Sequence, residues 1–385
     1  MKRRVAVVTE IIAPYRIPVF NALARGDCID LHVIFLSETD AYLREWRVYK
    51  EEIRFSYEVL PGWRRRIANR NVLLNWGIAR SLDKASPQAI ICGGYNYLAS
   101  WQVARWSDRN KVPLLLWSES TDADHRGGHA AVEILKKFFL RKCEACIVPG
   151  RSAFDYLAKL SVPQHVIHTA PDAVDNEFFK RVCSCVLSDA AAYRRKLDLP
   201  ERYFLFAGRL VKEKGVFDLL DAYASLDPEL RSNAALVFAG NGPARAELER
   251  KATAIDPGSV HFAGFLHRRE LGAVYALADM LVFPTHTDPW GLVVNEAMSC
   301  GLPIIATSVA GCTADLVEAG RNGLIIPPSD VAQLASAMTL LARNPELRKS
   351  MGAHSREKIG QFSPEACADG LARAASLVSG SARYV

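Results

Sequence analysis

Short runs of apolar residues recur along the whole chain, separated by stretches with the hydrophobic spacing of amphipathic helices. A run that is apolar throughout, rather than at alternate positions, is typical of a strand buried on both faces of a parallel sheet. Strands that alternate with helices form βαβ units, which build doubly wound sheets. The runs form two series: residues 5–9, 31–36, 89–92, 113–117, 145–149 and 166–168, then 203–207, 234–239, 260–263, 280–284, 303–307 and 324–327. We therefore expect an α/β protein with two Rossmann-like domains.

The length of 385 residues suits two domains of this kind. We place the boundary after residue 175, which gives domains of residues 1–175 and 176–362. The stretch 180–196 is polar and predicts an irregular connection. The segment that begins Ser363-Pro364-Glu365 predicts a final amphipathic helix, with serine as the N-cap and proline in the first turn.

Composition excludes several classes of protein. Hydrophobic residues make up 50% of the chain and charged residues 23%, which excludes a disordered chain. No stretch approaches the roughly 20 apolar residues of a membrane-spanning helix. The apolar run after Arg4 ends at Glu10, too early for a signal peptide, so a cytoplasmic location is expected.

The nine cysteines predict free thiols. Two close pairs occur, Cys143/Cys146 and Cys183/Cys185, but a zinc site needs two suitably spaced pairs or added histidines. Cysteine is among the most buried residue types, and free thiols suit the reducing cytosol. We expect buried thiols and no metal site.

The surplus of positive over negative charge lies entirely in the first half of the chain. Residues 1–175 contain 25 Lys and Arg against 19 Asp and Glu, a surplus of +6, whereas residues 176–385 contain 23 of each. The segment Trp63-Arg64-Arg65-Arg66, with Arg70 and Trp76, combines basic and aromatic residues. It is either a solvated loop or a landing site for an anionic membrane or an acidic acceptor. No recognised nucleic-acid-binding motif accompanies it, so nucleic acid is not an expected partner.

Two glycine-containing segments follow apolar runs of the second series. Gly208 and Arg209 follow one run, and Lys214 precedes the next helix, so two cations can converge at the carboxyl edge of the sheet. Arginine and lysine in this arrangement suit a diphosphate. Gly240 and Gly242 follow the next run, but a lone G-x-G is weak evidence for a dinucleotide site.

The segment from Asp288 to Glu296 carries the strongest signal. Gly291 opens a helix, and the unpaired N–H groups of Gly291, Leu292 and Val293 form a natural seat for an anion. Glu296 lies about one and a half turns into that helix. Because a diphosphate repels a carboxylate, the expected partner of Glu296 is neutral, such as the paired hydroxyls of a ribose. Asp288 is expected to face another polyol.

Taken together, these motifs resemble the group 1, or family 4, retaining glycosyltransferases. The resemblance is dense over residues 200–330 and thinner before them. The pattern Asp288-x7-Glu296, followed by Ala297-Met298 and Gly301-x-Pro303, is similar to the family's E-x7-E signature. Two further segments of the second half match the family, Gly208-Arg209 with Lys214-Gly215 and Gly240-x-Gly242-Pro243. In the first half the resemblance rests on Pro14-Tyr15-Arg16, Ser118-Glu119-Ser120, Asp175 and Phe178.

The resemblance implies a GT-B fold and a hexosyltransferase-type enzyme without metal or other cofactor. Residues 1–175 would bind the acceptor and residues 176–362 a nucleotide-sugar donor, with UDP-sugars favoured, while residues 363–385 would cross back to the first domain. The implied donor-binding residues are Gly208, Arg209, Lys214, Gly240, Gly242, Phe265, Leu266, Asp288, Gly291, Leu292, Val293 and Glu296. Arg209, Lys214 and Asp288 would also be catalytic, and Tyr15, Arg16 and Tyr95 would lie on the acceptor side.

Two positions depart from the family pattern. Asp288 stands where the signature has glutamate, which keeps the charge but shortens the reach by one methylene. Many members place a histidine after a strand of the first domain. Here the matching strand leads into Glu119, with His125 further along the loop, and either residue can take that catalytic place.

The acceptor stays open between two alternatives. A lipid-linked or anionic glycan, met at the inner face of the membrane during assembly of cell-surface polysaccharide or glycolipid, suits the basic segment. A small soluble acceptor, as in secondary-metabolite glycosylation, is the other. The cations paired with two acids argue against a sugar-nucleotide epimerase of the same fold, and the change at Asp288 leaves an inactive binding homologue as a third reading.

Overall fold

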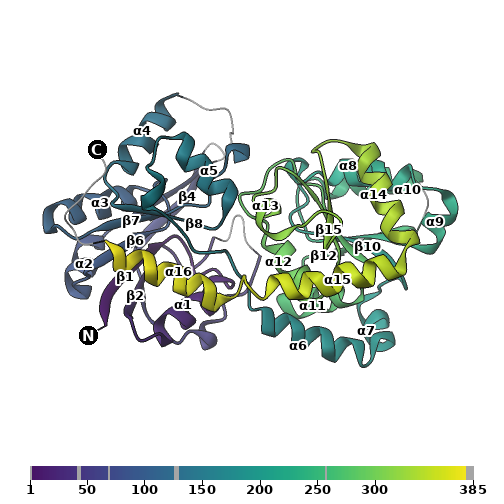
Figure 1. Ribbon diagram of the computed structural model, residues 1–385, viewed down its shortest axis with the longest axis horizontal. Coiled ribbons are helices and arrows are strands. Elements are labelled where there is room, and N and C mark those ends of the chain that lie inside the picture. Colours follow the sequence, from purple (N-terminus) through teal and green to yellow (C-terminus); the bar gives the residue numbers. More distant parts are fainter. Residues whose placement is uncertain (1, 41–44, 68–69, 125–129, 256–257, 379–385) are drawn as a thin grey trace. The chain divides into compact units, whose positions relative to one another are not determined.

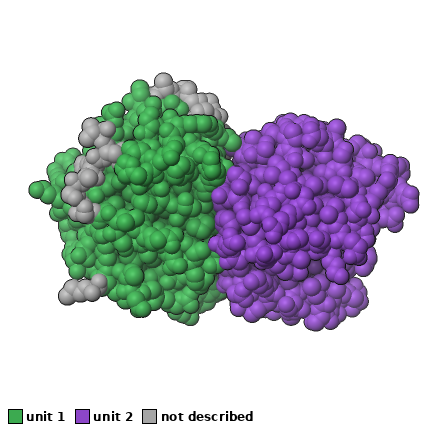
Figure 2. Space-filling view, viewed as in Figure 1, with its two compact units in different colours: residues 1–174, 363–385 green, residues 175–362 purple. Residues whose placement is uncertain are grey.

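A computed structural model describes the chain except residues 1, 41–44, 68–69, 125–129, 256–257 and 379–385 (Figure 1). The chain divides into two compact units (Figure 2). Unit 1 comprises Met1–Val174 and Ser363–Val385, and unit 2 comprises Asp175–Phe362. This division lies one residue from the boundary expected after residue 175.

Unit 1 is built on a seven-stranded parallel sheet of order β3-β2-β1-β6-β7-β8-β9. Its strands are β1 (Arg3–Thr9), β2 (Ile29–Phe35), β3 (Ser56–Val59), β6 (Ala89–Cys92), β7 (Leu114–Trp117), β8 (Ala145–Val148) and β9 (Ile167–Thr169). Its helices are α1 (Arg16–Arg25), α2 (Ile78–Ala85), α3 (Leu98–Asn110), α4 (Ala130–Leu140), α5 (Arg151–Lys159) and α16 (Pro364–Leu377), with short 3-10 helices at Lys50–Glu52, Asp122–Asp124 and Gln164–Val166. Strand β1 pairs with both β2 and β6, so the strand order reverses there.

Both faces of this sheet are covered, which explains the continuous apolar runs. Val5 and Val7 of β1 belong to one buried cluster, which contains side chains of α1 and α16. Ala6 and Val8 belong to a second cluster, which contains side chains of α2, α3, α4 and α5. Since successive side chains of a strand point to opposite faces, a strand between two such layers must be apolar at every position.

The terminal helix α16 belongs to unit 1, as expected. The Ser363 hydroxyl accepts a hydrogen bond from the N–H of Ala366 at 3.2 Å, and proline occupies the first turn. Helix α16 packs against α1, and Gly370 lies so close to β9 that an added Cβ would be 2.5 Å from the Thr169 carbonyl oxygen.

Unit 2 is built on a six-stranded parallel sheet of order β12-β11-β10-β13-β14-β15. Its strands are β10 (Tyr203–Ala207), β11 (Ala235–Ala239), β12 (Val260–Gly264), β13 (Met280–Phe283), β14 (Ile304–Thr307) and β15 (Gly323–Ile326). Its helices are α6 (Asn176–Leu187), α7 (Ala190–Leu197), α8 (Val216–Ala224), α9 (Pro228–Asn233), α10 (Arg245–Ile255), α11 (Arg268–Leu277), α12 (Leu292–Ser299), α13 (Thr313–Leu316), α14 (Val331–Arg343) and α15 (Pro345–Ile359). The strand order reverses at β10, which pairs with β11 and β13.

The expectation of an irregular connection at 180–196 is wrong, because α6 and α7 occupy it. The carboxylate of Asp175 caps α6 by accepting from the N–H of Phe178 at 2.9 Å. Phe179, Cys183 and Val186 are buried at i, i+4 and i+7, which is the spacing of one helical face. Their polar neighbours hid this stripe.

The basic segment is a β-hairpin and not the loop of the solvated-loop alternative. Strands β4 (Gly62–Ile67) and β5 (Arg70–Asn75) pair as an antiparallel hairpin outside the main sheets. Arg64 is only 11% exposed and forms ion pairs with Glu10 and Asp40, each at 2.9 Å. The side chains of Arg66 and Arg70 lie outside the described part of the structure.

The nine cysteines are free thiols. Cys143, Cys146 and Cys183 are buried as expected, whereas Cys185 is exposed. In the part of the chain that the structure describes, no helix has the length and apolar character needed to cross a bilayer.

The contact between Gly370 and β9 predicts that Gly370→Ala destabilises the protein. Helix propensity alone would favour alanine by about 1 kcal/mol. The clash with the backbone of β9 should outweigh it and lower the free energy of unfolding by about 1–3 kcal/mol. Urea denaturation measures this, with the exposed neighbour Asp369→Ala as the matched control. An unchanged or higher midpoint for Gly370→Ala would contradict the docking of α16.

Candidate functional site

The loops after β10 and β11 are packed backbone to backbone at the carboxyl edge of the unit 2 sheet. A Cβ on Gly240 would lie 1.9 Å from the carbonyl oxygen of Gly208, and one on Gly242 would lie 2.3 Å from that of Leu210. The N–H of Leu210 donates to the carbonyl of Asn241 at 2.9 Å. The G-x-G motif therefore serves a close approach of two loops, which places Gly208 and Arg209 at the reversal in strand order where doubly wound sheets bind ligands.

The loops after β10 and β13 also touch. Gly215, with φ +66°, lies so close to β13 that an added Cβ would be 1.9 Å from the carbonyl oxygen of Pro284. The Lys214 ammonium donates to a carboxylate oxygen of Asp288 at 2.5 Å and to the carbonyl of Thr287 at 3.0 Å. Two residues to which the sequence assigned separate ligand groups thus form one ion pair, with 22% and 18% of their side chains exposed.

Asp288 is fixed from several sides. Its second carboxylate oxygen accepts from the N–H of Trp290 at 3.1 Å, and its carbonyl accepts from the N–H of Gly311 at 2.9 Å. A Cβ on Gly311 would lie 1.8 Å from the Pro289 carbonyl oxygen, so the chain can pass here only as glycine. The position of the carboxylate is therefore set by backbone contacts.

Helix α12 begins where the sequence places it. Gly291 is its N-cap, with φ +100°, and an added Cβ would lie 2.7 Å from the ring of Phe283. Leu292 and Val293 form its first turn and are partly buried. The N–H groups at the start of a helix have no intrahelical partner and can accept an anion as ligand.

Glu296 lies on the next turn of α12 and is held by Tyr275 of α11. The phenol of Tyr275 donates to a carboxylate oxygen of Glu296 at 2.8 Å. Burial raises the pKa of the Glu296 carboxyl to about 7, and the hydrogen bond from Tyr275 opposes that rise. Burial and the adjacent carboxylate hold the pKa of Tyr275 well above its usual value. No feature of the sequence singled out Tyr275, which lies in an ordinary amphipathic helix.

The remaining residues expected to bind the donor lie at the same edge of the unit 2 sheet. Arg209 is exposed directly after Gly208. Phe265 and Leu266 follow β12 and are partly buried, and the ring of Phe265 meets the ring of His267 edge-on at 5.3 Å.

A second polar cluster lies at the carboxyl edge of the unit 1 sheet. Arg16, at the start of α1, donates to Asp172 at 3.0 Å and forms an ion pair with Glu119, which follows β7. The guanidinium carbon of Arg16 also lies 3.8 Å from the ring centroid of Trp117. Burial raises the pKa of Asp172 to about 7, although Arg16 opposes the rise. Asp172 was not identified from the sequence, because a single acid after a short strand carries no motif.

Of the other residues expected in unit 1, Tyr15 adjoins the Arg16 cluster, with the guanidinium carbon of Arg16 5.4 Å from its ring centroid, whereas Tyr95 has separate surroundings. The ring of Tyr15 packs edge-on against Trp46 at 5.9 Å. Tyr95 contacts α4, with its ring 6.1 Å from that of Phe139 and 5.6 Å from the Lys136 ammonium. His125 lies outside the described residues, so only Glu119 has a described position.

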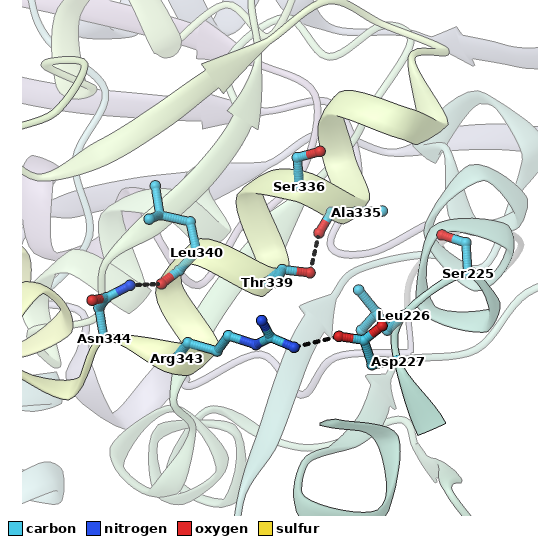
Figure 3. Close-up of a pocket in the computed structure, with 9 residues that line it drawn as sticks. All are labelled: Ser225, Leu226, Asp227, Ala335, Ser336, Thr339, Leu340, Arg343 and Asn344. Carbon is cyan, nitrogen blue, oxygen red and sulfur yellow. Dashed lines mark hydrogen bonds and ion pairs between the residues drawn. The ribbon is translucent and has the colours of Figure 1, made fainter. Parts of the chain in front are cut away.

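A pocket of about 550 Å³ in unit 2 is distinct from these edges (Figure 3). Its lining residues are Ser225, Leu226, Asp227, Ala335, Ser336, Thr339, Leu340, Arg343 and Asn344. They come from the region after α8 and from α14, and Arg343 reaches across to pair with Asp227. Because α8 starts at the carboxyl edge of β10, its far end lies at the opposite edge, away from Lys214 and Glu296.

Comparison with known proteins finds a family similarity in the second half of the chain. Residues 189–358 match the family model of the glycosyl transferases group 1. Residues 189–358 are thus similar to the glycosyl transferases group 1. The matched residues include the Lys214–Asp288 pair, the start of α12 and Glu296.

Two curated relatives illustrate the similarity in sequence. The α-D-kanosaminyltransferase of Streptomyces kanamyceticus is 29% identical over 243 residues, which cover 60% of this chain and 60% of that protein. The D-inositol 3-phosphate glycosyltransferase of Corynebacterium jeikeium is 35% identical over 187 residues, covering 46% and 44%. The chain thus matches about half of the length of these relatives.

The fold of the whole chain is shared with solved glycosyltransferases of the GT-B class. HepE of Anabaena, solved in complex with UDP and glucose, superposes with a TM-score of 0.76 over 97% of this chain and 99% of its own, at 16% identity. The expected GT-B architecture, with two Rossmann-like sheets and a returning terminal helix, is confirmed.

The surroundings of Glu296 predict a pH-dependent stability. The folded pKa of about 7 exceeds the ordinary value of 4.5, so the folded protein retains a proton that the unfolded chain releases. This contribution is complete below pH 4.5 and is lost as the pH rises through 7. Between pH 5 and 8, the wild type should therefore lose about 1–3 kcal/mol relative to Glu296→Gln, which lacks the titration.

Denaturant titrations of both proteins at the two pH values measure the difference. Glu357→Gln, at an exposed glutamate of α15, is the matched control. If the free energies of unfolding of the wild type and of Glu296→Gln differed by the same amount at both pH values, Glu296 would not titrate in this range.

Proposed function

We propose that the protein is a retaining, metal-independent glycosyltransferase that transfers a hexose from a UDP-sugar to an acceptor hydroxyl. One observation carries the proposal. The Lys214–Asp288 pair, the start of α12 and Glu296 lie on loops and a helix at the carboxyl edge of one sheet, within the residues that match the group 1 family. Cationic, anion-binding and hydroxyl-binding groups on one edge suit the diphosphate and ribose of a nucleotide sugar.

The donor would be held by three kinds of group. Glu296 would accept from the two ribose hydroxyls, as a carboxylate that the Tyr275 phenol orients. Arg209, Lys214 and the first N–H groups of α12 would receive the diphosphate, while Gly208, Gly240 and Gly242 let the backbone approach it closely. Phe265 and Leu266 would flank the base. The choice of uridine draws support from HepE, which was solved with UDP.

Asp288 would have two tasks. Its ion pair keeps the Lys214 ammonium in place before the donor arrives, which lowers the entropy lost on binding. Once the diphosphate shares the ammonium, the carboxylate of Asp288 can accept hydroxyls of the transferred sugar. Its short side chain is compatible with this role because backbone contacts already fix it.

Retention of the configuration at the anomeric carbon would follow from substitution at one face of the sugar. The bond from the anomeric carbon to the diphosphate oxygen breaks, and the acceptor oxygen bonds to the same face of that carbon. The acceptor proton passes to the departing phosphate. Arg209, Lys214 and the helix N–H groups would stabilise the charge that develops on the diphosphate, and loss of one such donor costs about 10²–10³ in rate. In unit 1, the polar catalytic group would be His125 or Glu119, the second of which Arg16 would position.

The acceptor that we favour is a lipid-linked or anionic glycan, met at the cytoplasmic face of the membrane during assembly of cell-surface polysaccharide or glycolipid. The +6 surplus of residues 1–175 supports it, as do the exposed Trp63 and Trp76. A small soluble acceptor is the second candidate. It is favoured by the similarity to the D-inositol 3-phosphate glycosyltransferase, whose name specifies a phosphorylated acceptor that cations would also suit.

Thermal shift with UDP, GDP, ADP and TDP tests the donor site. At a hundred times its Kd, UDP should stabilise the protein by about 2.7 kcal/mol, and the other nucleotides at the same concentration should stabilise it less. Glu296→Gln should keep the fold but weaken UDP binding roughly 10- to 100-fold, because one hydrogen-bonding carboxylate is lost. Glu357→Gln is the control for the substitution itself. Equal UDP affinity in Glu296→Gln and the wild type would remove Glu296 from the site.

Metal independence has a direct test in the same assay. Because cations and helix N–H groups supply the charge that a metal would provide, the shift with UDP should be the same in EDTA as in Mg²⁺ or Mn²⁺. A Lys214→Ala variant should lose most of the shift in all three conditions. A shift that appears only with the divalent cation would contradict the assignment of the diphosphate to Arg209 and Lys214.

A further inference from the structure

Helix α4 exposes large apolar side chains on the side that faces away from the unit 1 sheet. Ile134, Leu135 and Phe138 are 67%, 54% and 52% exposed. On the opposite side of the same helix, Phe139 and Leu140 are 0% and 3% exposed and belong to the core. The helix is thus apolar on both sides, although packing on the sheet requires only one apolar stripe.

Basic residues share this outward side. Lys137 and Arg141 are exposed, and their spacing from Ile134 at i+3 and i+7 places them on the same helical face. Residues 134–142 contain no acid. The neighbouring Lys136 points the other way, because its ammonium contacts the hydroxyl of Tyr156 and the ring of Tyr95. We call Ile134, Leu135, Lys137, Phe138 and Arg141 the α4 face.

The α4 face is held in a fixed position by α3. The ring of Phe138 stacks on Trp101 of α3, with centroids 6.0 Å apart and planes at 16°. The Lys142 ammonium pairs with Asp108 of α3 at 2.8 Å. The apolar residues are therefore presented outward on an anchored helix, and more than half of each remains in water despite these contacts.

The β4–β5 hairpin provides a second exposed surface next to α3, against which β5 packs. Trp63 pairs with Leu74 across the hairpin, and these two are 42% and 40% exposed. Trp76 is 56% exposed. Arg64 pairs with the buried Leu73 on the inner side and is neutralised by Glu10 and Asp40, so it does not contribute to an outer basic surface. Arg65 is exposed on the outer side.

We propose that the α4 face is a membrane-binding surface that inserts its apolar side chains into an anionic bilayer, with the outer side of the hairpin as a second contact. Aliphatic and phenylalanine side chains among lysine and arginine are typical of helices that lie in the plane of a bilayer interface, where tryptophan is also enriched. The charge surplus of residues 1–175 has the sign that anionic lipids attract. The α4 face would be the surface at which the protein meets its lipid-linked acceptor, and for that acceptor the proposal rests on the proposed function.

Co-sedimentation of the full chain with vesicles tests the proposal. The wild type should bind vesicles of phosphatidylglycerol and phosphatidylcholine, and bind pure phosphatidylcholine at least tenfold more weakly. Ile134→Ser/Leu135→Ser/Phe138→Ser should lower the partition coefficient at least tenfold. Lys137→Ser/Arg141→Ser should remove the preference for anionic vesicles. Leu187→Ser/Leu340→Ser is the matched control, since these leucines of unit 2 are 54% and 45% exposed, and should stay within twofold of the wild type.

Other outcomes decide against the proposal. Equal binding by the triple variant and the wild type, or no binding of the wild type at low salt, would overturn it. A dimer that sediments without lipid and dissociates in the triple variant would show that a second copy covers the α4 face. The thermal shift with UDP should be unchanged in every variant. Vesicle binding without any nucleotide shift would leave this surface standing while the proposed transferase activity fails.

Discussion

The carboxyl edge of the unit 2 sheet depends on backbone contacts that leave no room for a side chain. Gly240 against Gly208, Gly215 against Pro284 and Gly311 against Pro289 each bring a carbonyl oxygen within 2 Å of where a Cβ would be. These contacts join the loops after β10, β11, β13 and β14 along one edge of the sheet. The Lys214–Asp288 pair and the start of α12 are fixed on that edge, so their geometry does not require a ligand to organise it.

Each unit keeps one carboxyl group in an environment that disfavours its charge, but the partners differ. Glu296 faces the phenol of Tyr275, which donates a hydrogen bond to it, and burial raises the pKa of its carboxyl to about 7. Asp172 faces the guanidinium of Arg16, which also contacts Glu119, so one cation pairs with two carboxyl groups. The first arrangement suits contact with neutral hydroxyls. The second holds a partly exposed carboxylate, that of Glu119, in one orientation.

Features that follow from local physics could be predicted from the sequence. The buried strands were recognisable because both faces of each sheet are covered, and Gly291 because it alone can open α12 beside Phe283. Contacts between segments that are distant in the sequence could not be predicted. Tyr275 reaches Glu296 from another helix, Lys214 reaches Asp288 from another loop, and Asp172 reaches Arg16 across 156 positions. Helix α6 was missed because charged residues interrupt its stripe of buried side chains. Only the structure shows that α6 packs against α11.

The return of α16 to unit 1 has a consequence for how the chain is made. Residues 1–174 leave the ribosome first, but the side of their sheet that carries α1 stays open until residues 363–377 follow. The whole of unit 2, about 190 residues, is synthesised in between. At about 5–20 residues per second the delay amounts to roughly 10–40 s. Unit 2 is continuous in sequence and can complete its core in that interval, so the unit translated first is the last to close.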